Sequence, residues 1–277
     1  MTISKTKLQT LCVQIILISI GTTMLIPFAW MLATSVKPKD EVYVFPPEWI
    51  PSHFVFSNYR EAWNAAPFPR FLFNSGLVAT ITTLSQLVTC SLAAYAFARI
   101  NFWGRDTIFL LFLGTMMIPG QVTLIPTYLI MKWLGWIDTY YALIVPGLTS
   151  VSNTFLLRQF FLSFPTELED AAKIDGCSQL GILSKIVIPN SKPALVVVGV
   201  FTFLGSWNSF VWPLIVTNRT EMKTIQIGLT WFRDQFYTID WTQLMAGSTI
   251  AALPIIILFL IFQRHLVSGI VLSGLKF

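Results

Sequence analysis

Long apolar runs alternate with short polar intervals along this chain, a pattern that predicts a helical membrane protein. The first run, Leu11–Ala33, contains no charged residue. At about 1.5 Å per residue it is long enough to cross a hydrocarbon core of about 30 Å. A signal peptide is the alternative, because Lys5 and Lys7 precede the run. The run is longer than a typical signal core, and no small-residue cleavage site follows it cleanly, so we expect a membrane helix.

Five further apolar runs follow, and turn residues separate them. Pro119-Gly120 and Pro146-Gly147 interrupt two of these runs. Such breaks are tolerated at membrane depth only against protein or a wet cavity. The interval Ser35–Arg70 is rich in proline and aromatic residues, which suits an external loop with a short interfacial helix near Asn58–Ala65. We expect one transmembrane domain over residues 1–277 with six spans, at about 11–33, 71–98, 107–131, 139–162, 194–216 and 242–262.

Composition and charge support the bilayer as the solvent. The 277 residues are 55% hydrophobic and only 11% charged, whereas soluble domains average about 25% charged residues. The mean hydropathy is +0.68. Basic residues are scattered and the net charge is +5, so we expect no nucleic-acid partner. The three cysteines and two histidines show no disulfide or metal spacing, so we expect no metal site.

The distribution of basic residues predicts the orientation of the chain. Six spans place both termini on one side of the membrane. Of the 18 Lys and Arg residues, ten then fall on the side of the termini and eight on the other side. The positive-inside rule therefore favours cytoplasmic termini.

The longest polar interval in the second half of the chain is Ser163–Pro193, which we expect to form a helical hairpin. Thr166 and Glu169 match a capping box at a helix start. Gly176 stands where a left-handed residue would end that helix, and Ser178 can cap a second one. Acidic residues stand in the first turn, where the helix dipole stabilises negative charge. The small pair Ala171-Ala172 permits close approach of another surface. From composition alone, a membrane-surface hairpin that merely links two spans is the alternative.

The segment Ser163–Pro193, called the coupling hairpin below, resembles the coupling loop of binding-protein-dependent ABC importer permeases, whose pattern is E-A-A-x3-G-x9-I-x-L-P. The chain has Asp170-Ala171-Ala172, Gly176, Ile186 and Ile188-Pro189 at this spacing. Asp170 replaces the usual glutamate and is one methylene shorter, and Ile188 replaces the usual leucine. The resemblance covers nearly the whole chain. Three segments are similar to the carbohydrate-uptake branch, and to its maltose-type second permease subunit in particular: Glu167–Gly176, Ser206–Asn218 and Ser268–Phe277.

The resemblance implies an all-α type I ABC importer permease fold in a bacterial inner membrane. It has six transmembrane helices and a cytoplasmic coupling helix-turn-helix between spans four and five. In that family the loop inserts into a cleft on an ATPase, and ATP-driven closure of two ATPase subunits rocks the bundles. Implied partners are a second permease subunit, two ABC ATPase subunits, an extracytoplasmic solute-binding protein and the lipid bilayer. Implied coupling residues are Glu167, Glu169, Asp170, Ala171, Ala172, Asp175, Gly176, Ile186 and Pro189.

The chain has no recognisable nucleotide site of its own. Gly269 and Gly274 have the separation of P-loop glycines, but Leu275-Lys276 follows instead of Lys-Ser/Thr. We therefore expect no catalytic residue and no cofactor bound by this chain, with ATP and Mg²⁺ held at the partner ATPase subunits.

Polar residues within the predicted spans are neutral, and this argues against proton or sodium relays. Hydrogen-bonding groups beside aromatic faces suit a sugar or polyol. Helix–helix contacts or an aromatic belt are the alternative roles for these residues. The candidate pathway residues are Gln121, Ser206, Trp207, Asn208 and Trp212, together with Ser209 and the Ser and Thr residues of the second span.

We predict the permease subunit of an ATP-driven importer for a sugar or sugar-derived solute, such as an oligosaccharide, a glycerol phosphate or a glycosylated compatible solute. A stand-alone secondary transporter of a neutral solute is the alternative, but it needs a coupling-ion site and usually inverted repeats. Neither is evident in the sequence. A membrane enzyme would need convergent ionisable or metal-binding groups, and the spans offer none.

Overall fold

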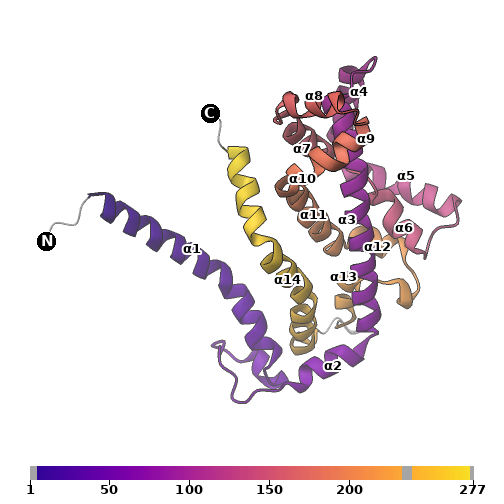
Figure 1. Cartoon of the computed structure of the whole chain (residues 1–277). Coiled ribbons are helices and arrows are strands. Elements are labelled where there is room, and N and C mark those ends of the chain that lie inside the picture. Colours follow the sequence, from indigo (N-terminus) through magenta and orange to yellow (C-terminus); the bar gives the residue numbers. More distant parts are fainter. Residues whose placement is uncertain (1–4, 233–238, 275–277) are drawn as a thin grey trace. The chain divides into compact units, whose positions relative to one another are not determined.

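The computed structural model describes the backbone of residues 5–232 and 239–274, and the side chains of residues 10–232, 239–264 and 266. The predicted all-α class is confirmed, because helices make up the described chain and it contains no β-strand. Figure 1 labels the α-helices. The elements in order are α1 Lys5–Ser35, η1 Lys39–Tyr43, α2 Ser57–Ala65, α3 Phe68–Arg99, α4 Arg105–Gly114, η2 Thr115–Met117, α5 Gly120–Trp133, α6 Tyr140–Ile144, η3 Val145–Gly147, α7 Val151–Leu162, α8 Thr166–Ile174, α9 Gln179–Ile182, η4 Leu183–Val187, α10 Ile188–Asn190, α11 Lys192–Trp207, α12 Val211–Val216, η5 Thr220–Met222, α13 Ile225–Gly228, η6 Leu229–Phe232 and α14 Trp241–Gly274.

The chain divides into two compact units. One unit contains Met1–Phe68 and Leu229–Leu253, and the other contains Pro69–Gly228 and Pro254–Phe277. Each is described by itself below. This division into compact units does not test the expectation that residues 1–277 form a single transmembrane domain.

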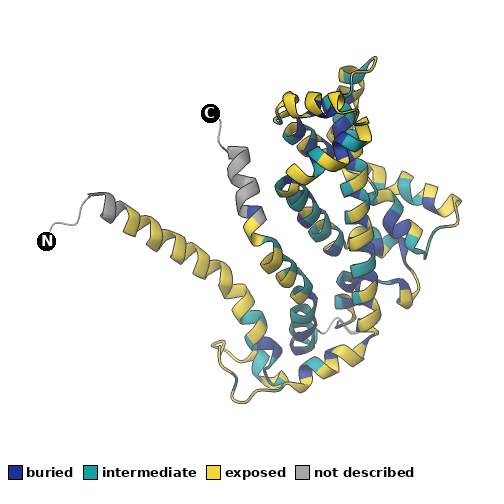
Figure 2. Cartoon of the chain, in the orientation of Figure 1, coloured by how far each residue is buried: buried dark blue, intermediate teal, exposed yellow. Residues whose placement is uncertain are grey.

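In the first unit, a buried polar side chain of the short helix α2 binds the end of the long apolar helix α1. The predicted short helix near Asn58–Ala65 is present as α2. The buried Asn58 amide donates hydrogen bonds to the carbonyls of Ser35, at 3.1 Å, and Lys37, at 2.9 Å. These bonds satisfy two carbonyls at and just after the end of α1. From Thr10 to Ala29, α1 is exposed (Figure 2) and apolar, as a helix facing lipid or a partner would be.

The start of α14 packs tightly within the same unit. A Cβ on Gly247 would lie 2.7 Å from Phe232 Cε2 and 3.1 Å from Phe68 Cζ, so no larger residue fits without movement. The rings of Phe68 and Phe232 lie 5.6 Å apart. Lys39 Nζ lies 2.7 Å from Asp240 Oδ2 and 3.8 Å from Glu61 Oε2. The start of α14 is therefore held by packing against Phe68 and Phe232, and by the ion pair with Lys39 at the start of η1.

The second unit has its core where α3, α7 and α11 run side by side (Figure 1). Small residues on α3 let the neighbouring helices approach closely, as in membrane helix pairs generally. The buried cluster comprises Cys90, Ala94, Tyr95, Ala98, Leu157, Phe161, Ala172, Ile182, Leu183, Val187, Ala194 and Val198.

Four helices are long and apolar enough to cross a membrane, among the described residues. They are Thr10–Ser35, Phe68–Arg99, Tyr140–Leu162 and Trp241–Arg264. Two further pairs are bent: Arg105–Met117 with Gly120–Trp133 by 98°, and Gln179–Asn190 with Lys192–Trp207 by 82°. If each pair counts as one span there are up to six, and the predicted number of six stays a prediction. The break expected at Pro119-Gly120 is present, between η2 and α5.

The predicted fifth span, Ala194–Val216, is not one continuous helix. Helix α11 ends at Trp207 and α12 begins at Val211. Asn208 is the C-cap of α11, and the Ser209 N–H donates to the Ser206 carbonyl at 3.2 Å. Asn and Ser compete with helical hydrogen bonding, which explains why the apolar run breaks at this point.

Candidate functional site

The coupling hairpin lies at the C-terminal end of α3, beside the end of α7 (Figure 1). Its first helix, α8, begins after Pro165, and no side chain caps its start. The capping box predicted for Thr166 and Glu169 is therefore wrong. The reason is that the Glu169 carboxylate is turned inward toward a partner on α3, Arg99.

Gly176 ends α8 in the left-handed conformation that the sequence predicts, with φ +79°. The Cys177 N–H donates to the Ala172 carbonyl at 2.9 Å, and the Gly176 N–H donates to the Lys173 carbonyl at 3.0 Å. These two bonds form a Schellman motif. Ser178 then caps α9, since its hydroxyl accepts from the Gly181 N–H at 3.2 Å. The turn that joins the two helices is thus built from local hydrogen bonds, and both predictions for it are confirmed.

The second arm of the hairpin is less regular than a single helix. Short helices α9 and α10 flank a π-helical turn, η4, before the chain bends into α11. Gln179 at the start of α9 is fixed to α3, because the Tyr95 hydroxyl donates to its Oε1 at 2.9 Å. A π-helical turn often marks a functional site.

One buried ion pair ties the first arm to the bundle. Arg99 Nε lies 3.0 Å from Glu169 Oε1, and the two side chains are only 9% and 6% exposed. The contact is ionic rather than a well-aligned hydrogen bond, since these two atoms have no hydrogen-bond partner. The same guanidinium donates to the carbonyls of Phe161, at 2.7 Å, and Phe164, at 2.6 Å. Arg99 therefore holds α8 and the end of α7 together.

The predicted coupling residues separate into an inner and an outer face. Glu169 and Ala172 are buried against the bundle, and Ile186 is half-buried. Asp170 points outward and forms an exposed ion pair with Lys173 at 2.9 Å. The remaining exposed members are Glu167, Ala171, Asp175, Gly176 and Pro189.

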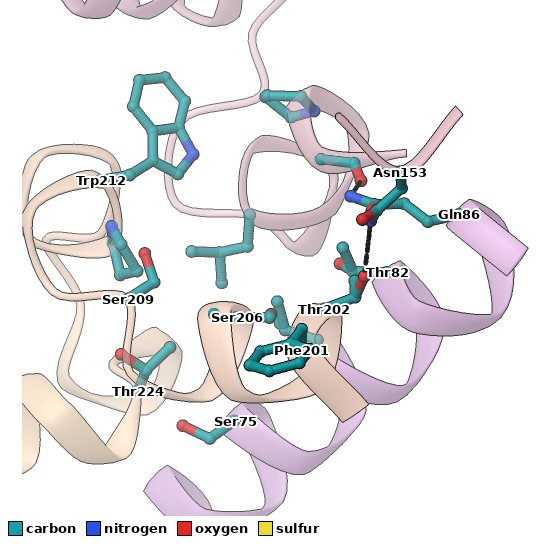
Figure 3. A pocket seen from close by; sticks show the side chains of 16 residues that line it. Ser75, Thr82, Gln86, Asn153, Phe201, Thr202, Ser206, Ser209, Trp212 and Thr224 are labelled. Atoms are coloured by element: carbon teal, nitrogen blue, oxygen red, sulfur yellow. Dashed lines mark hydrogen bonds between the residues drawn. The ribbon is translucent and has the colours of Figure 1, made fainter. Parts of the chain in front are cut away.

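A cavity of about 420 Å³ lies within the second unit (Figure 3). Residues of α3, α7, α11 and α12 surround it, together with the segment around Pro146-Gly147. None of its lining side chains carries a charge. The lining residues are Ser75, Val78, Thr82, Gln86, Leu143, Pro146, Gly147, Asn153, Phe201, Thr202, Gly205, Ser206, Ser209, Trp212, Pro213 and Thr224.

A neutral hydrogen-bond network forms one wall of this cavity. The Asn153 amide donates to Gln86 Oε1 at 2.7 Å and to Thr202 Oγ1 at 2.9 Å. Gln86 Nε2 in turn donates to the Gly147 carbonyl at 2.7 Å. The three side chains come from α3, α7 and α11, so the network holds these helices in register (Figure 3). On the opposite side, the Trp212 indole is fixed by donating to the Ala142 carbonyl at 2.8 Å.

The structure brings together some of the predicted pathway residues and separates others. Ser206 and Trp212 line the cavity, as does Ser209. Gln121 is exposed on α5, away from the lining. Trp207 is buried beside Phe203, with ring centroids 5.7 Å apart, and Asn208 accepts a hydrogen bond from Gln226 at 3.2 Å. Neither of these two lines the cavity.

Sequence reasoning missed the amide network of Gln86, Asn153 and Thr202. The signal that could have found it is polarity at membrane depth, since all three residues lie inside predicted spans. What the sequence could not show is that three separate helices place these side chains within hydrogen-bonding distance of one another.

Apolar helices long enough to span a membrane, a neutral cavity between them, and a polar hairpin anchored at their ends define a membrane transport protein. The sequence profile described as "binding-protein-dependent transport system inner membrane component" matches residues 86–271. The chain belongs to this family.

Curated relatives support this membership, and a solved structure has the same fold. The chain is 37% identical over 256 residues to the probable ABC transporter permease protein YurM of Bacillus subtilis, covering 90% of this chain and 83% of YurM. It is 36% identical over 255 residues to the arabinooligosaccharides transport system permease protein AraQ of Bacillus subtilis, covering 91% and 90%. A chain of a bacterial ABC transporter that imports the acidic polysaccharide alginate has the same fold, with a TM-score of 0.82, 22% identity, and coverage of 96% and 99%.

Proposed function

We propose that this chain is one permease subunit of an ATP-driven importer that passes a neutral sugar or sugar-derived solute across a bacterial inner membrane. The observation that carries the proposal is the coupling hairpin. Its inner face is bound to α3 and α7, and its outer face presents the charged pair Asp170–Lys173. A segment that is fixed inside and free outside is suited to receive force from another protein.

The energy source in this proposal lies in partner subunits. Two ABC ATPase subunits hold ATP and Mg²⁺, and one of them docks on the outer face of the coupling hairpin. A second permease subunit completes the pathway, and an extracytoplasmic solute-binding protein delivers the solute. The termini and the hairpin lie on the cytoplasmic side, as the count of basic residues indicates.

The cavity supports a neutral solute. A buried anion without a paired cation is costly, and the cavity lining offers hydroxyl and amide groups but no cation. The hydroxyls of Ser206 and Ser209 and the fixed indole of Trp212 suit the hydroxyl groups and apolar face of a sugar ring. The relative AraQ is named for arabinooligosaccharides, which are sugars of this class.

Filling the cavity tests the proposal. Gly205 lines it, and a Cβ there would have no atom within 4 Å. In proteoliposomes with the complete complex and its binding protein, Gly205→Phe is expected to lower uptake of labelled arabino-oligosaccharide about tenfold. Gly205→Ala is the control and should keep near-normal uptake, because it adds one methyl group in open space. Labelled glycerol 3-phosphate serves as the charged probe.

Three results would contradict the proposal. Normal oligosaccharide uptake by Gly205→Phe would remove the cavity from the pathway. Uptake of glycerol 3-phosphate in preference to oligosaccharide would exclude a neutral solute. Uptake by this chain alone, driven by an ion gradient without ATP, would make it a secondary transporter.

A further inference from the structure

We propose that the buried Arg99–Glu169 pair is the joint that passes movement of the coupling hairpin to the transmembrane helices. The inference rests on the proposed importer function and assigns positioning residues that lie outside both the ATPase contact and the solute cavity. Glu169 belongs to the predicted coupling set, but its inward direction gives it a role different from that of its neighbour Asp170.

Burial makes this pair a rigid connection. Both side chains are nearly inaccessible, and their charged atoms lie 3.0 Å apart. Separating them would leave two unpaired charges in a water-poor site, which is strongly unfavourable. When a partner displaces α8, the end of α3 that carries Arg99 is therefore expected to move with it.

One guanidinium connects three elements. Arg99 is the last residue of α3, it contacts Glu169 on α8, and it donates to the carbonyls of Phe161 and Phe164. Phe161 lies in the last turn of α7, and Phe164 follows that helix. The planar guanidinium spreads five N–H donors over three nitrogens in a fixed fork, whereas the lysine ammonium gathers its three donors on one atom. The joint therefore depends on arginine and not merely on positive charge.

Contacts on both sides of the pair restrict rotation of the hairpin about this joint. Tyr95, one turn before Arg99 on α3, donates to Gln179 at the start of α9. Ala172, three residues after Glu169, is buried in the cluster that includes Leu157 and Phe161. The hairpin is thus held at both of its arms, so a push on its outer face is passed to α3 and α7 rather than lost in rotation.

A stability role alone does not require an ion pair. Well-packed apolar residues of similar volume often stabilise a buried site as well as a salt bridge does. This gives the experiment its main variant. In Arg99→Met/Glu169→Leu both charges are removed together, so no unpaired charge remains in the site.

The experiment compares variants in the complete importer, reconstituted with its ATPase subunits, second permease and binding protein. The measured quantity is the coupling ratio, the solute imported per ATP hydrolysed, with assembly checked by size-exclusion chromatography and melting temperature. For Arg99→Met/Glu169→Leu we expect an assembled complex that hydrolyses ATP while the coupling ratio falls about tenfold. Arg99→Lys should retain an intermediate ratio, since it keeps the ionic contact and loses the forked bonds.

The matched control is the pair Arg105–Asp106, which is near in sequence, has the same 3.0 Å separation, and has side chains that are 29% and 74% exposed. Arg105→Gln/Asp106→Asn should keep the wild-type coupling ratio. A normal ratio in Arg99→Met/Glu169→Leu would overturn the joint while leaving the importer function intact. If the double variant fails to assemble, Arg99→Lys decides, and a wild-type ratio in it would overturn the joint. Absence of ATP-dependent uptake by the wild-type complex would instead overturn the importer function.

Discussion

Gly176 shows how a single backbone conformation sets the shape of the coupling hairpin. Its φ of +79° is one that residues with a side chain adopt at a cost, and a Cβ there would meet no atom within 4 Å. The cost of Gly176→Ala is therefore conformational, at about 1–2 kcal/mol. We expect a lower melting temperature for the purified complex and reduced uptake, because the turn that orients α8 against α9 is strained.

Gly176→Asn is the matched variant, because asparagine visits the left-handed region more readily than alanine does. It should lie between the wild type and Gly176→Ala in melting temperature. If alanine and asparagine were equally harmful, the effect would come from the added side chain and not from the backbone.

Residues within one turn of the chain could be predicted from sequence, and residues with distant partners could not. Gly176 and Ser178 act through hydrogen bonds to backbone only a few positions away, so their types and spacing identify their roles. Glu169 stands at the correct spacing for a capping box but pairs with Arg99 on α3 instead. Tertiary charge pairing outweighs the local bond, and local sequence contains no trace of that partner.

Element boundaries could likewise be predicted where the signal is local, and could not be predicted where it depends on tertiary packing. The short helix α2 and the break before α5 were predictable, because polar and proline signals stand close to the boundaries. The break between α11 and α12 falls inside an apolar run. From the sequence alone, Asn208 and Ser209 are candidate pathway residues in this run rather than signals of a helix end. Which of the intramembrane polar residues face the cavity depends on the packing of α3, α7 and α11, so Gln86 and Asn153 emerged only from the structure.

An ion pair between the loop after α1 and the start of α14 predicts a pH dependence. The hydrogen bond to Asp240 raises the pKa of Lys39 above 10.5. Burial raises the pKa of Asp240, but bonds from Lys39, the Gln243 backbone and Thr242 outweigh it and leave the pKa below 3.8. The stabilisation by the Lys39–Asp240 ion pair is therefore fully present between about pH 3.8 and pH 10.5. It is lost as the pH falls through the lowered pKa of Asp240 or rises through the raised pKa of Lys39.

The variant that tests this pair is Asp240→Asn. Asparagine still caps the start of α14 but carries no charge. Both side chains of the pair are partly exposed, so the expected loss is small, about 0.2–1 kcal/mol. The melting temperature should be lower than that of the wild type from pH 5 to pH 9, and the difference should close below about pH 3.8. An unchanged difference at pH 3 would show that the Asp240 charge does not contribute through Lys39.

At the scale of the whole molecule, the proposed importer needs a surface on this chain that a partner subunit can contact. Ile174, the last residue of α8, is 88% exposed, and Leu168 and Leu180 on the same hairpin are also exposed. Exposed apolar residues beside the charged pair Asp170–Lys173 are typical of a protein contact. We infer that the partner ATPase covers these side chains.

Ile174→Asp tests whether this surface is needed for energy input. The side chain makes little contact within the chain, so the fold and membrane insertion should be unchanged. A charge buried at the ATPase contact without a partner should weaken retention of the ATPase and lower ATP-dependent uptake about tenfold. Asn101→Asp adds the same charge at an exposed position outside the coupling hairpin and should leave both measurements near the wild-type values. Co-purification of the ATPase and uptake in proteoliposomes report the two effects separately. Wild-type retention with normal uptake in Ile174→Asp would move the energy-receiving surface away from the end of α8, while loss of uptake with full retention would assign Ile174 to force transfer rather than to attachment.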